Sequence, residues 1–229
     1  MKAVILAAGK GMRMRPLTEE KPKPLLPVSG RPILEHIFDL LPSSVDEILV
    51  VVGYKGEMIR EYFGDDYKGK KITYIEQKEQ KGTADALFLC KEALGAGRFM
   101  LLYADDLHSA ESIKKCAEKD LSLLVYPTNT PERFGIVETD DEGKIVSIEE
   151  KPEKPKSNLA AVGVYVLDDR IFNYAPNLEK GEYFLTSMIA GMIADYPFYA
   201  VETDLWIPIG YPEDLAKAES YLAKEGIKG

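Results

Sequence analysis

The chain alternates short apolar runs with amphipathic segments through its first half. Residues 4–6, 48–52 and 99–104 are continuous apolar runs, which is typical of strands covered on both faces in a parallel sheet. Between them, residues 32–41 and 83–94 place apolar side chains on one helical face. This order predicts βαβ units and therefore an α/β fold with three layers and a mostly parallel mixed sheet.

The middle of the chain is richer in strands. We expect extended segments at residues 121–126, 135–139, 145–149 and 161–167. The sequence Asp-Asp-Glu-Gly at 140–143 predicts a turn. One helix is expected at about 183–194. Another is expected from Pro212, because Pro212, Glu213 and Asp214 are residue types favoured in the first turn of a helix. No linker or repeat interrupts the chain, so we expect a single domain over residues 1–229.

The composition matches an ordinary globular protein, with 45% hydrophobic and 29% charged residues. A formal net charge of −9 argues against nucleic-acid binding, which requires a basic surface. No apolar run approaches the roughly 20 residues of a membrane helix, and the start lacks the features of a signal peptide. We therefore expect a cytoplasmic protein without membrane or nucleic-acid partners. A homo-oligomer is compatible with the sequence.

The two cysteines and two histidines are not expected to form a disulfide, a zinc site or a catalytic nucleophile. Cys90 and Cys116 have neither disulfide nor zinc spacing, and Cys90 is expected to be a buried, inert thiol. His36 lies in a predicted helix and is expected to be packed or half exposed. Nucleophilic catalysis through histidine is therefore not favoured.

The segment 6–18, Leu-Ala-Ala-Gly-Lys-Gly-Met-Arg-Met-Arg-Pro-Leu-Thr, is the most informative. It follows the first predicted strand and so lies at the carboxyl edge of the sheet, where open α/β folds bind ligands. Gly9 and Gly11 permit a tight turn whose amides approach phosphate oxygens, and Arg13 adds positive charge. The spacing is neither GxGxxG nor GxxxxGK[ST], and the alternative is a charged surface loop.

Two polar segments follow. Residues 21–28, Lys-Pro-Lys-Pro-Leu-Leu-Pro-Val, should be extended and stiff, which would present a lysine at a fixed point or serve as a rigid connector. In Gln-Lys-Glu-Gln-Lys-Gly-Thr, residues 77–83, the Gln77 amide can match the edge of uracil or thymine. Gly82 would permit backbone approach beside the base, and Thr83 begins the next helix.

Acidic residues stand at the ends of three later strands. Ala-Asp-Asp-Leu at 104–107 follows a buried strand, so a carboxylate there would face the glycine loop as a magnesium ligand would. Phe-Gly-Ile-Val-Glu at 134–138 and Glu-Glu-Lys-Pro at 149–152 could bind a polyhydroxylated ligand. The alternative for all three is solvated charges at strand ends.

Taken in order, these segments resemble the sugar-1-phosphate nucleotidylyltransferase family over residues 1–215. The family pattern is LAAGxGTRLxPLT, PKPxxPV, Qx₄GTAxA, a GD-like acid, (F/Y)GxxE and EKP. Each motif is weak singly, but their order and spacing make chance agreement improbable. The resemblance implies a Rossmann-like nucleotidyltransferase fold and is close to the uridylyl and thymidylyl branch.

The resemblance also implies roles for individual residues. Arg13 and Lys23 would be catalytic and stabilise the phosphoryl charge, and Asp105 would hold Mg²⁺. The nucleoside triphosphate would contact Leu6, Ala8, Gly9, Gly11, Gln77, Gly82 and Thr83. The sugar phosphate would contact Gly135, Glu150, Lys151, Val162 and Gly163.

One departure from the family pattern concerns the metal. The sequence Trp-Ile-Pro-Ile-Gly-Tyr-Pro, residues 206–212, resembles the family's WxDxGTP, in which the acid is the second metal ligand. Here that position is Pro208, which has no side-chain ligand atom. Asp204 is four residues away, roughly 13 Å along a strand, which is too far for a simple replacement. Mg²⁺ commonly binds through one carboxylate plus phosphates and water, so Asp105 alone could suffice.

The expected function is Mg²⁺-dependent transfer of a nucleotidyl group from UTP or dTTP to a hexose-1-phosphate, with glucose-1-phosphate favoured. The products would be a nucleotide-sugar and pyrophosphate. One alternative, motivated by Pro208, is a nucleotide-sugar-binding or regulatory homologue with weak catalysis. Another is a cytidylyltransferase for a non-sugar phosphate, although the EKP segment favours a sugar.

Overall fold

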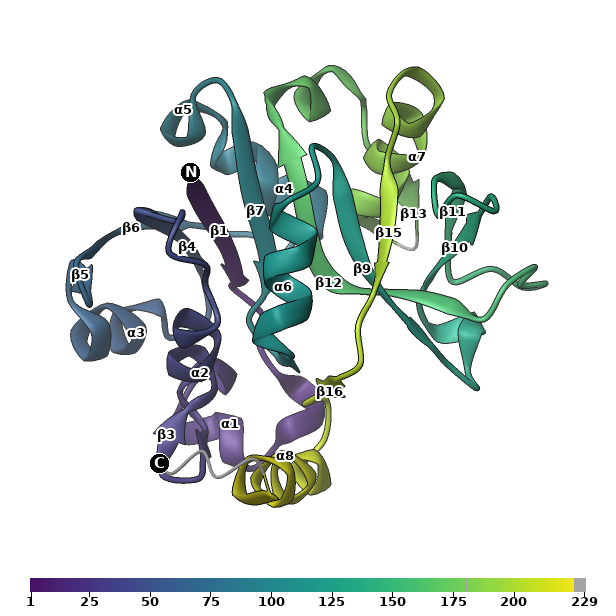
Figure 1. The fold of residues 1–229 in the computed structure, drawn as a ribbon. Coiled ribbons are helices and arrows are strands. Elements are labelled where there is room, and N and C mark those ends of the chain that lie inside the picture. The colour runs from purple at the N-terminus through teal and green to yellow at the C-terminus, as the bar shows by residue number, and fades with distance from the viewer. Residues whose placement is uncertain (180, 225–229) are drawn as a thin grey trace.

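A computed structural model describes residues 1–179 and 181–224 of the protein (Figure 1). Within these residues a ten-stranded sheet has the order β11-β10-β12-β7-β1-β4-β6-β5, and β9 pairs with both β12 and β15. Its strands are β1 (Lys2–Ala7), β4 (Glu47–Val52), β5 (Asp66–Tyr67), β6 (Lys70–Glu76), β7 (Arg98–Tyr103), β9 (Ser122–Pro127), β10 (Gly135–Thr139), β11 (Ile145–Glu150), β12 (Leu159–Asp168) and β15 (Tyr199–Glu202). Three short pairs lie outside it: β2 (Pro27–Val28) with β3 (Arg31–Pro32), β8 (Asp106–His108) with β16 (Trp206–Pro208), and β13 (Leu178–Glu179) with β14 (Glu182–Tyr183).

The sheet has a parallel half and a largely antiparallel half. Strands β7, β1, β4 and β6 are parallel neighbours, and Ile5 of β1 pairs with Val50 of β4 and Leu102 of β7. On the other side, β12 runs antiparallel to β7, β9 and β10. The apolar runs that predicted parallel strands therefore form the centre of a mixed sheet, as expected.

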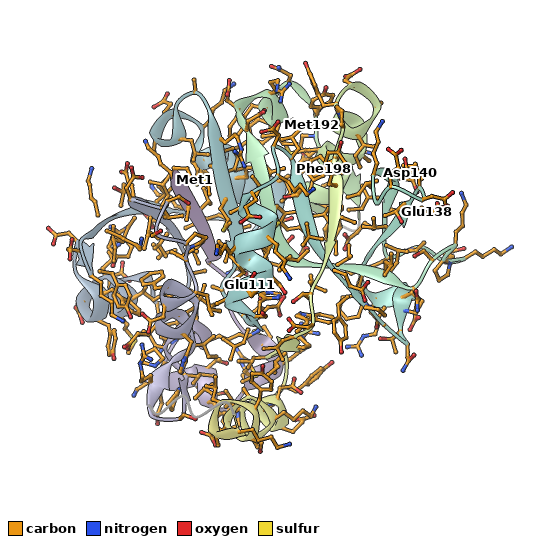
Figure 2. All side chains as sticks on the ribbon, viewed as in Figure 1. Met1, Glu111, Glu138, Asp140, Met192 and Phe198 are labelled. Atoms are coloured by element: carbon orange, nitrogen blue, oxygen red, sulfur yellow. The ribbon has the colours of Figure 1, made fainter. Side chains whose placement is uncertain are left out.

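Alternation along the buried strands produces three layers. In β1, Ala3 and Ile5 join one hydrophobic cluster, whereas Val4 joins the cluster on the opposite face. The helices are α1 (Leu17–Glu20), α2 (Ile33–Asp39), α3 (Gly56–Phe63), α4 (Thr83–Leu89), α5 (Lys91–Leu94), α6 (Ala110–Ala117), α7 (Leu185–Asp195) and α8 (Pro212–Lys224). Buried residues of α2, α3, α6 and α8 pack in the first cluster, and those of α4, α5 and α7 in the second. Met192 and Phe198, labelled in Figure 2, are fully buried in the second cluster.

The structure differs from the sequence prediction at several points. The helix expected at 83–94 is interrupted at Cys90, whose amide bonds to the Leu87 carbonyl three residues back and so tightens the turn. Residues Lys23–Leu25 form a 3₁₀ turn between extended neighbours rather than a continuous extended segment. Strand β6 and helices α3 and α6 were not predicted. The domain expected over 1–229 includes residues 180 and 225–229, which lie outside the described residues.

The burial predictions for the side chains are confirmed. Cys90 is fully buried, and burial raises its pKa to about 12, so it is an inert thiol at neutral pH. His36 is buried in α2, with Nε2 2.9 Å from the Val28 carbonyl oxygen. In the part of the chain that the structure describes, no helix is both long and apolar enough to cross a membrane.

Candidate active site

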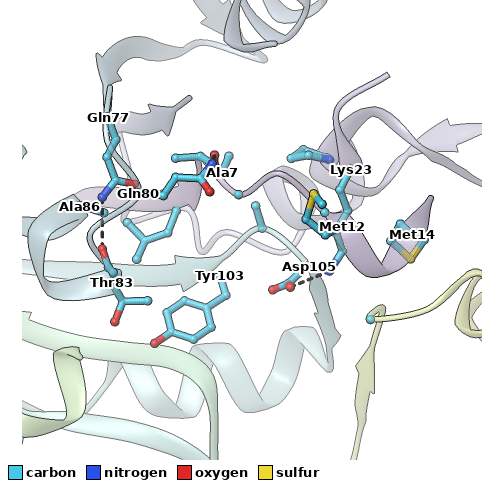
Figure 3. Close-up of a pocket in the computed structure, with 18 of the residues that line it drawn as sticks. Ala7, Met12, Met14, Lys23, Gln77, Gln80, Thr83, Ala86, Tyr103 and Asp105 are labelled. Atoms are coloured by element: carbon cyan, nitrogen blue, oxygen red, sulfur yellow. Dashed lines mark hydrogen bonds and ion pairs between the residues drawn. The ribbon is translucent and has the colours of Figure 1, made fainter. Parts of the chain in front are cut away.

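A first cavity of about 360 Å³ opens at the carboxyl ends of β1, β6 and β7 (Figure 3). This edge of a parallel sheet collects the loops that follow neighbouring strands, so residues far apart in sequence meet there. Among the residues that line the cavity are Leu6, Ala8, Gly9, Gly11, Arg13, Lys23, Gln77, Gln80, Gly82, Thr83, Tyr103 and Asp105. All seven residues predicted for the nucleotide are among them.

The two glycines of the first loop have different surroundings. A Cβ at Gly9 would meet no described atom within 4 Å, so this part of the loop is open to a ligand. Gly11 has φ +59°, and a Cβ there would lie 2.9 Å from Thr18 Cγ2 and 3.2 Å from Lys23 Cβ. Thr18 Oγ1 also donates to the Gly11 carbonyl oxygen over 2.9 Å. Gly11 therefore lets the loop pack against the segment that carries Lys23.

Lys23 and Asp105 form an ion pair across the first cavity. Lys23 Nζ lies 2.7 Å from Asp105 Oδ2, and Lys23 is 8% exposed. The 3₁₀ turn Lys23–Leu25 follows Pro22, and its buried Pro24 and Leu25 anchor the lysine. Asp105 lies two residues after the end of β7, so the pair joins the proline-rich segment to the end of a central strand.

Gln77 follows β6 and is 5% exposed, with its amide held by two acceptors. Its Nε2 donates to Asp85 Oδ2 over 2.8 Å and to the Gly82 carbonyl oxygen over 3.2 Å. Gln80, which was not predicted, also lines the cavity and donates through Nε2 to the Ala8 carbonyl oxygen over 2.7 Å. Two glutamine side chains therefore border this end of the cavity.

The structure gives a reason for glycine at position 82 that the sequence did not reveal. With φ +105°, a Cβ at Gly82 would lie 2.4 Å from the carbonyl oxygen and 2.7 Å from the amide nitrogen of Tyr183. The Tyr183 amide donates to the Lys81 carbonyl oxygen over 2.7 Å. Thr83 begins α4, as predicted, and its Oγ1 accepts from the Leu185 amide over 3.0 Å. The glycine thus accommodates the backbone of β14 in addition to bordering the cavity.

A second cavity of about 800 Å³ adjoins the first. It is lined by Gly135, Glu150, Lys151 and Gly163, four of the five residues predicted for the sugar phosphate. The fifth, Val162, stands between Ala161 and Gly163 in β12, but its side chain is 1% exposed and packs in the first hydrophobic cluster. Alternation along a strand directs neighbouring side chains to opposite faces, so Val162 is excluded from the lining.

The lining of the second cavity is held by polar contacts. Glu150 Oε2 accepts from Thr186 Oγ1 over 2.9 Å, and Lys151 Nζ lies 3.2 Å from Glu150 Oε1. A Cβ at Gly135 would lie 2.9 Å from Thr186 Cγ2, so the absence of a side chain at Gly135 leaves room for the Thr186 side chain that donates to Glu150. Arg133 also lines the cavity, although sequence analysis missed it beside the Phe-Gly motif.

The two cavities share five lining residues: Arg13, Thr83, Tyr103, Asp105 and Gly210. The Arg13 guanidinium carbon lies 5.2 Å from the centre of the Tyr211 ring, which places a cation over an aromatic face. A cation and a carboxylate therefore stand where the two cavities meet.

Pro208 lines the second cavity, opposite Asp106 in the antiparallel pair of β16 with β8. Burial raises the pKa of the Asp106 carboxyl well above its usual range, and the neighbouring charge of Asp105 raises it further. Asp106 thus lines this cavity beside Asp105, although the family resemblance pointed to Asp105 alone.

Asp204 lies elsewhere. It accepts a hydrogen bond from Ser112 Oγ over 3.1 Å at the start of α6 and is not among the described residues that line either cavity. Among the described residues, no group of three or more His, Cys, Asp or Glu side chains forms a metal-binding cluster. A metal at Asp105 would therefore rely on ligands from substrate and water.

Comparison with known sequences agrees with this architecture. A family model described as nucleotidyl transferase matches residues 2–225. The chain is similar to UTP–glucose-1-phosphate uridylyltransferase AglF of Haloferax volcanii, with 40% identity over 98% of each chain. It is 37% identical to the bifunctional protein GlmU of Methanocaldococcus jannaschii, over 97% of this chain but 54% of that relative, so it spans about half of GlmU.

Solved structures confirm the predicted fold class. A Bacillus anthracis protein described as a glucose-1-phosphate thymidylyltransferase, in complex with sucrose, has a TM-score of 0.84 and 28% identity, covering 96% of this chain and 94% of that one. A UDP-glucose pyrophosphorylase complexed with UDP-glucose shares the fold with a TM-score of 0.87 at 22% identity, covering 98% of each chain. With the family model matched over residues 2–225, the chain belongs to the nucleotidyl transferase family.

Proposed function

We propose that the protein transfers a nucleotidyl group from UTP or dTTP to a hexose-1-phosphate, with glucose-1-phosphate favoured. The observation that carries this proposal is the junction of two adjacent cavities at Arg13 and Asp105. A reaction that joins two anionic substrates needs two neighbouring sites with charge-stabilising groups between them. The names of the relatives, which include UTP–glucose-1-phosphate uridylyltransferase, support this substrate pair.

In this proposal the nucleoside triphosphate occupies the first cavity. The open backbone at Gly9 would face the phosphates, and Gln77 would contact the base. The sugar phosphate occupies the second cavity, where Glu150 would accept hydrogen bonds from sugar hydroxyls and Lys151 would pair with an anionic group.

The chemistry is an in-line displacement. An oxygen of the sugar phosphate forms a bond to the α-phosphorus, the bond from that phosphorus to the bridging oxygen breaks, and pyrophosphate leaves with the electron pair. No protein nucleophile is required, because the attacking phosphate is already an anion at neutral pH. Arg13 and Lys23 stabilise the negative charge that develops around the phosphorus.

The residues present fit a magnesium ion. The Asp105 side chain is 41% exposed and lines both cavities, and a carboxylate oxygen is a ligand that Mg²⁺ prefers. We propose that Asp105 holds Mg²⁺, which when bound would neutralise phosphate charge. Lys23 pairs with the same carboxylate over 2.7 Å and so helps to fix its position at the junction.

The test is pyrophosphate release with Mg²⁺, crossing UTP, dTTP, CTP, ATP and GTP against glucose-1-phosphate and N-acetylglucosamine-1-phosphate. We expect release with UTP or dTTP and glucose-1-phosphate. Strong preference for CTP would contradict the base assignment. Binding of a nucleotide-sugar by calorimetry, with no release for any pair, would favour the catalytically weak homologue that Pro208 suggests.

A further inference from the structure

The orientation of the Gln77 side-chain amide is fixed by its two hydrogen-bond acceptors. Its terminal group lies 2.8 Å from Asp85 Oδ2 and 3.2 Å from the Gly82 carbonyl oxygen (Figure 3 draws the contact with Gly82 as a dashed line). A carboxylate and a carbonyl oxygen can only accept hydrogen bonds, so the NH₂ group of Gln77 must face both of them. Both of its N–H bonds are then used within the protein.

The carbonyl oxygen of Gln77 is therefore the group left for a ligand. Gln77 lines the first cavity and is 5% exposed, so this acceptor stands in a largely desolvated place. A buried acceptor favours a ligand that supplies a donor and disfavours one that supplies another lone pair. Uracil and thymine carry an N–H at position 3, whereas cytosine carries a lone pair there.

We propose that Asp85 is a positioning residue that selects uracil-type bases by holding the Gln77 amide with its oxygen toward the cavity. This inference rests on the proposed function, in which the first cavity binds the nucleotide. Asp85 is half-buried in the first turn of α4 and is not among the described residues that line either cavity. Its influence on the base is therefore exerted through Gln77.

An acid in the first turn of a helix also has an ordinary role, since it interacts favourably with the helix dipole. The two roles require different properties of the side chain. The dipole interaction needs the negative charge, whereas orientation of Gln77 needs only a hydrogen-bond acceptor. Asp85→Asn and Asp85→Ala both remove the charge, but only Asp85→Ala removes the acceptor. The pair therefore separates the two roles.

The experiment measures Kd for UTP and CTP by calorimetry on the intact chain and on both variants. The wild type should bind UTP more tightly than CTP, and Asp85→Asn should keep that ratio of Kd values. In Asp85→Ala the ratio should fall by about tenfold, which is the effect of one hydrogen bond. A loss of stability alone would not change the ratio. An unchanged ratio in Asp85→Ala, or equal falls in both variants, would overturn the assignment.

A second measurement needs no variant. UTP methylated at N3 lacks the donor, so the wild type should bind it at least about tenfold more weakly than UTP. Equal binding of the two nucleotides would refute the role of the Gln77 oxygen and with it that of Asp85. If the wild type binds neither UTP nor dTTP, the proposed function itself fails. That outcome is distinguishable from tight UTP binding that is insensitive to Asp85.

Discussion

At the scale of single residues, Arg13 has the position that the proposed chemistry requires. It lines both cavities, and its guanidinium lies over the Tyr211 ring. We predict that Arg13→Ala lowers kcat by about 100-fold, because loss of one group that stabilises transition-state charge costs about 3 kcal/mol. Steady-state pyrophosphate release measures this effect.

The matched control is Arg15→Ala, which removes another exposed arginine of the same loop from outside the two cavity linings. Arg15→Ala should leave kcat within a few-fold of wild type. Because Arg13 is exposed, its loss should not change the melting temperature appreciably. Equal kinetic effects of the two substitutions would show that only net charge matters.

Alanine substitutions at Gly82 and Gly97 would separate the cost of backbone strain from the cost of steric overlap. Their φ values are +105° and +107°, but only a Cβ at Gly82 would collide with the Tyr183 backbone, while none at Gly97 would meet a described atom within 4 Å. We predict that Gly97→Ala lowers the free energy of unfolding by about 1–3 kcal/mol, the cost of a sparsely populated backbone conformation. Gly82→Ala should cost more, about 2–6 kcal/mol, because steric overlap with Tyr183 adds to the backbone strain. Urea unfolding checks both values, and equal costs would exclude a steric role for Tyr183.

At the scale of elements, the short pair β8–β16 contains a buried histidine. His108 is 4% exposed, and neither ring nitrogen has a hydrogen-bond partner among the described residues. Burial lowers its pKa to about 3, so the ring is neutral in the folded protein at ordinary pH. The unfolded chain binds a proton at this residue below about pH 6.5. The contribution of neutral His108 to stability is thus complete above pH 6.5 and is lost as pH falls toward 3.

The consequence is measurable as a pH-dependent free energy of unfolding. Between pH 7 and pH 5 the wild type should lose about 2 kcal/mol through His108, since each pH unit below the unfolded pKa costs about 1.4 kcal/mol. The His108→Leu variant should lack this part of the pH dependence, and it should keep the pH dependence that all other titrating groups contribute. Urea unfolding of both proteins at the two pH values isolates the difference. Parallel profiles would mean that His108 has the same pKa in the folded and unfolded states.

At the scale of the whole molecule, the proposed function requires a metal for activity, whereas folding should not require one. Two hydrophobic clusters cover the two faces of the sheet, and the described residues contain no cluster of three or more metal-ligating side chains. We predict that EDTA lowers pyrophosphate release by about 100-fold or more, because a metal contributes several kcal/mol of charge stabilisation. The melting temperature of the nucleotide-free protein should stay unchanged, and restored Mg²⁺ should restore activity. A large fall in melting temperature in EDTA would instead indicate a structural metal.

The local sequence determined the central strands and the strand ends that border the first cavity. The apolar runs at 4–6, 48–52 and 99–104 form most of β1, β4 and β7, and their side chains pack on both faces of the sheet, with only Leu6 and Tyr103 partly exposed. An apolar run without alternation can be buried only between two layers. Glycine and acidic residues directly after such strands then reach one edge of the sheet. This argument pointed to Gly9, Gly11 and a carboxylate within residues 104–107, and the family resemblance then singled out Asp105 and the other proposed site residues.

Tertiary structure alone decided which distant groups complete the site. The contact of Gly82 with Tyr183, the hydrogen bond of Gln77 with Asp85 and the exclusion of Val162 depend on strand order and packing. The same holds for the position of Asp106 opposite Pro208. Periodicity reports which face of its own element a residue occupies, but not which element packs against that face. The sequence thus indicated the segments that line the candidate site, and the fold determined which neighbours contact them.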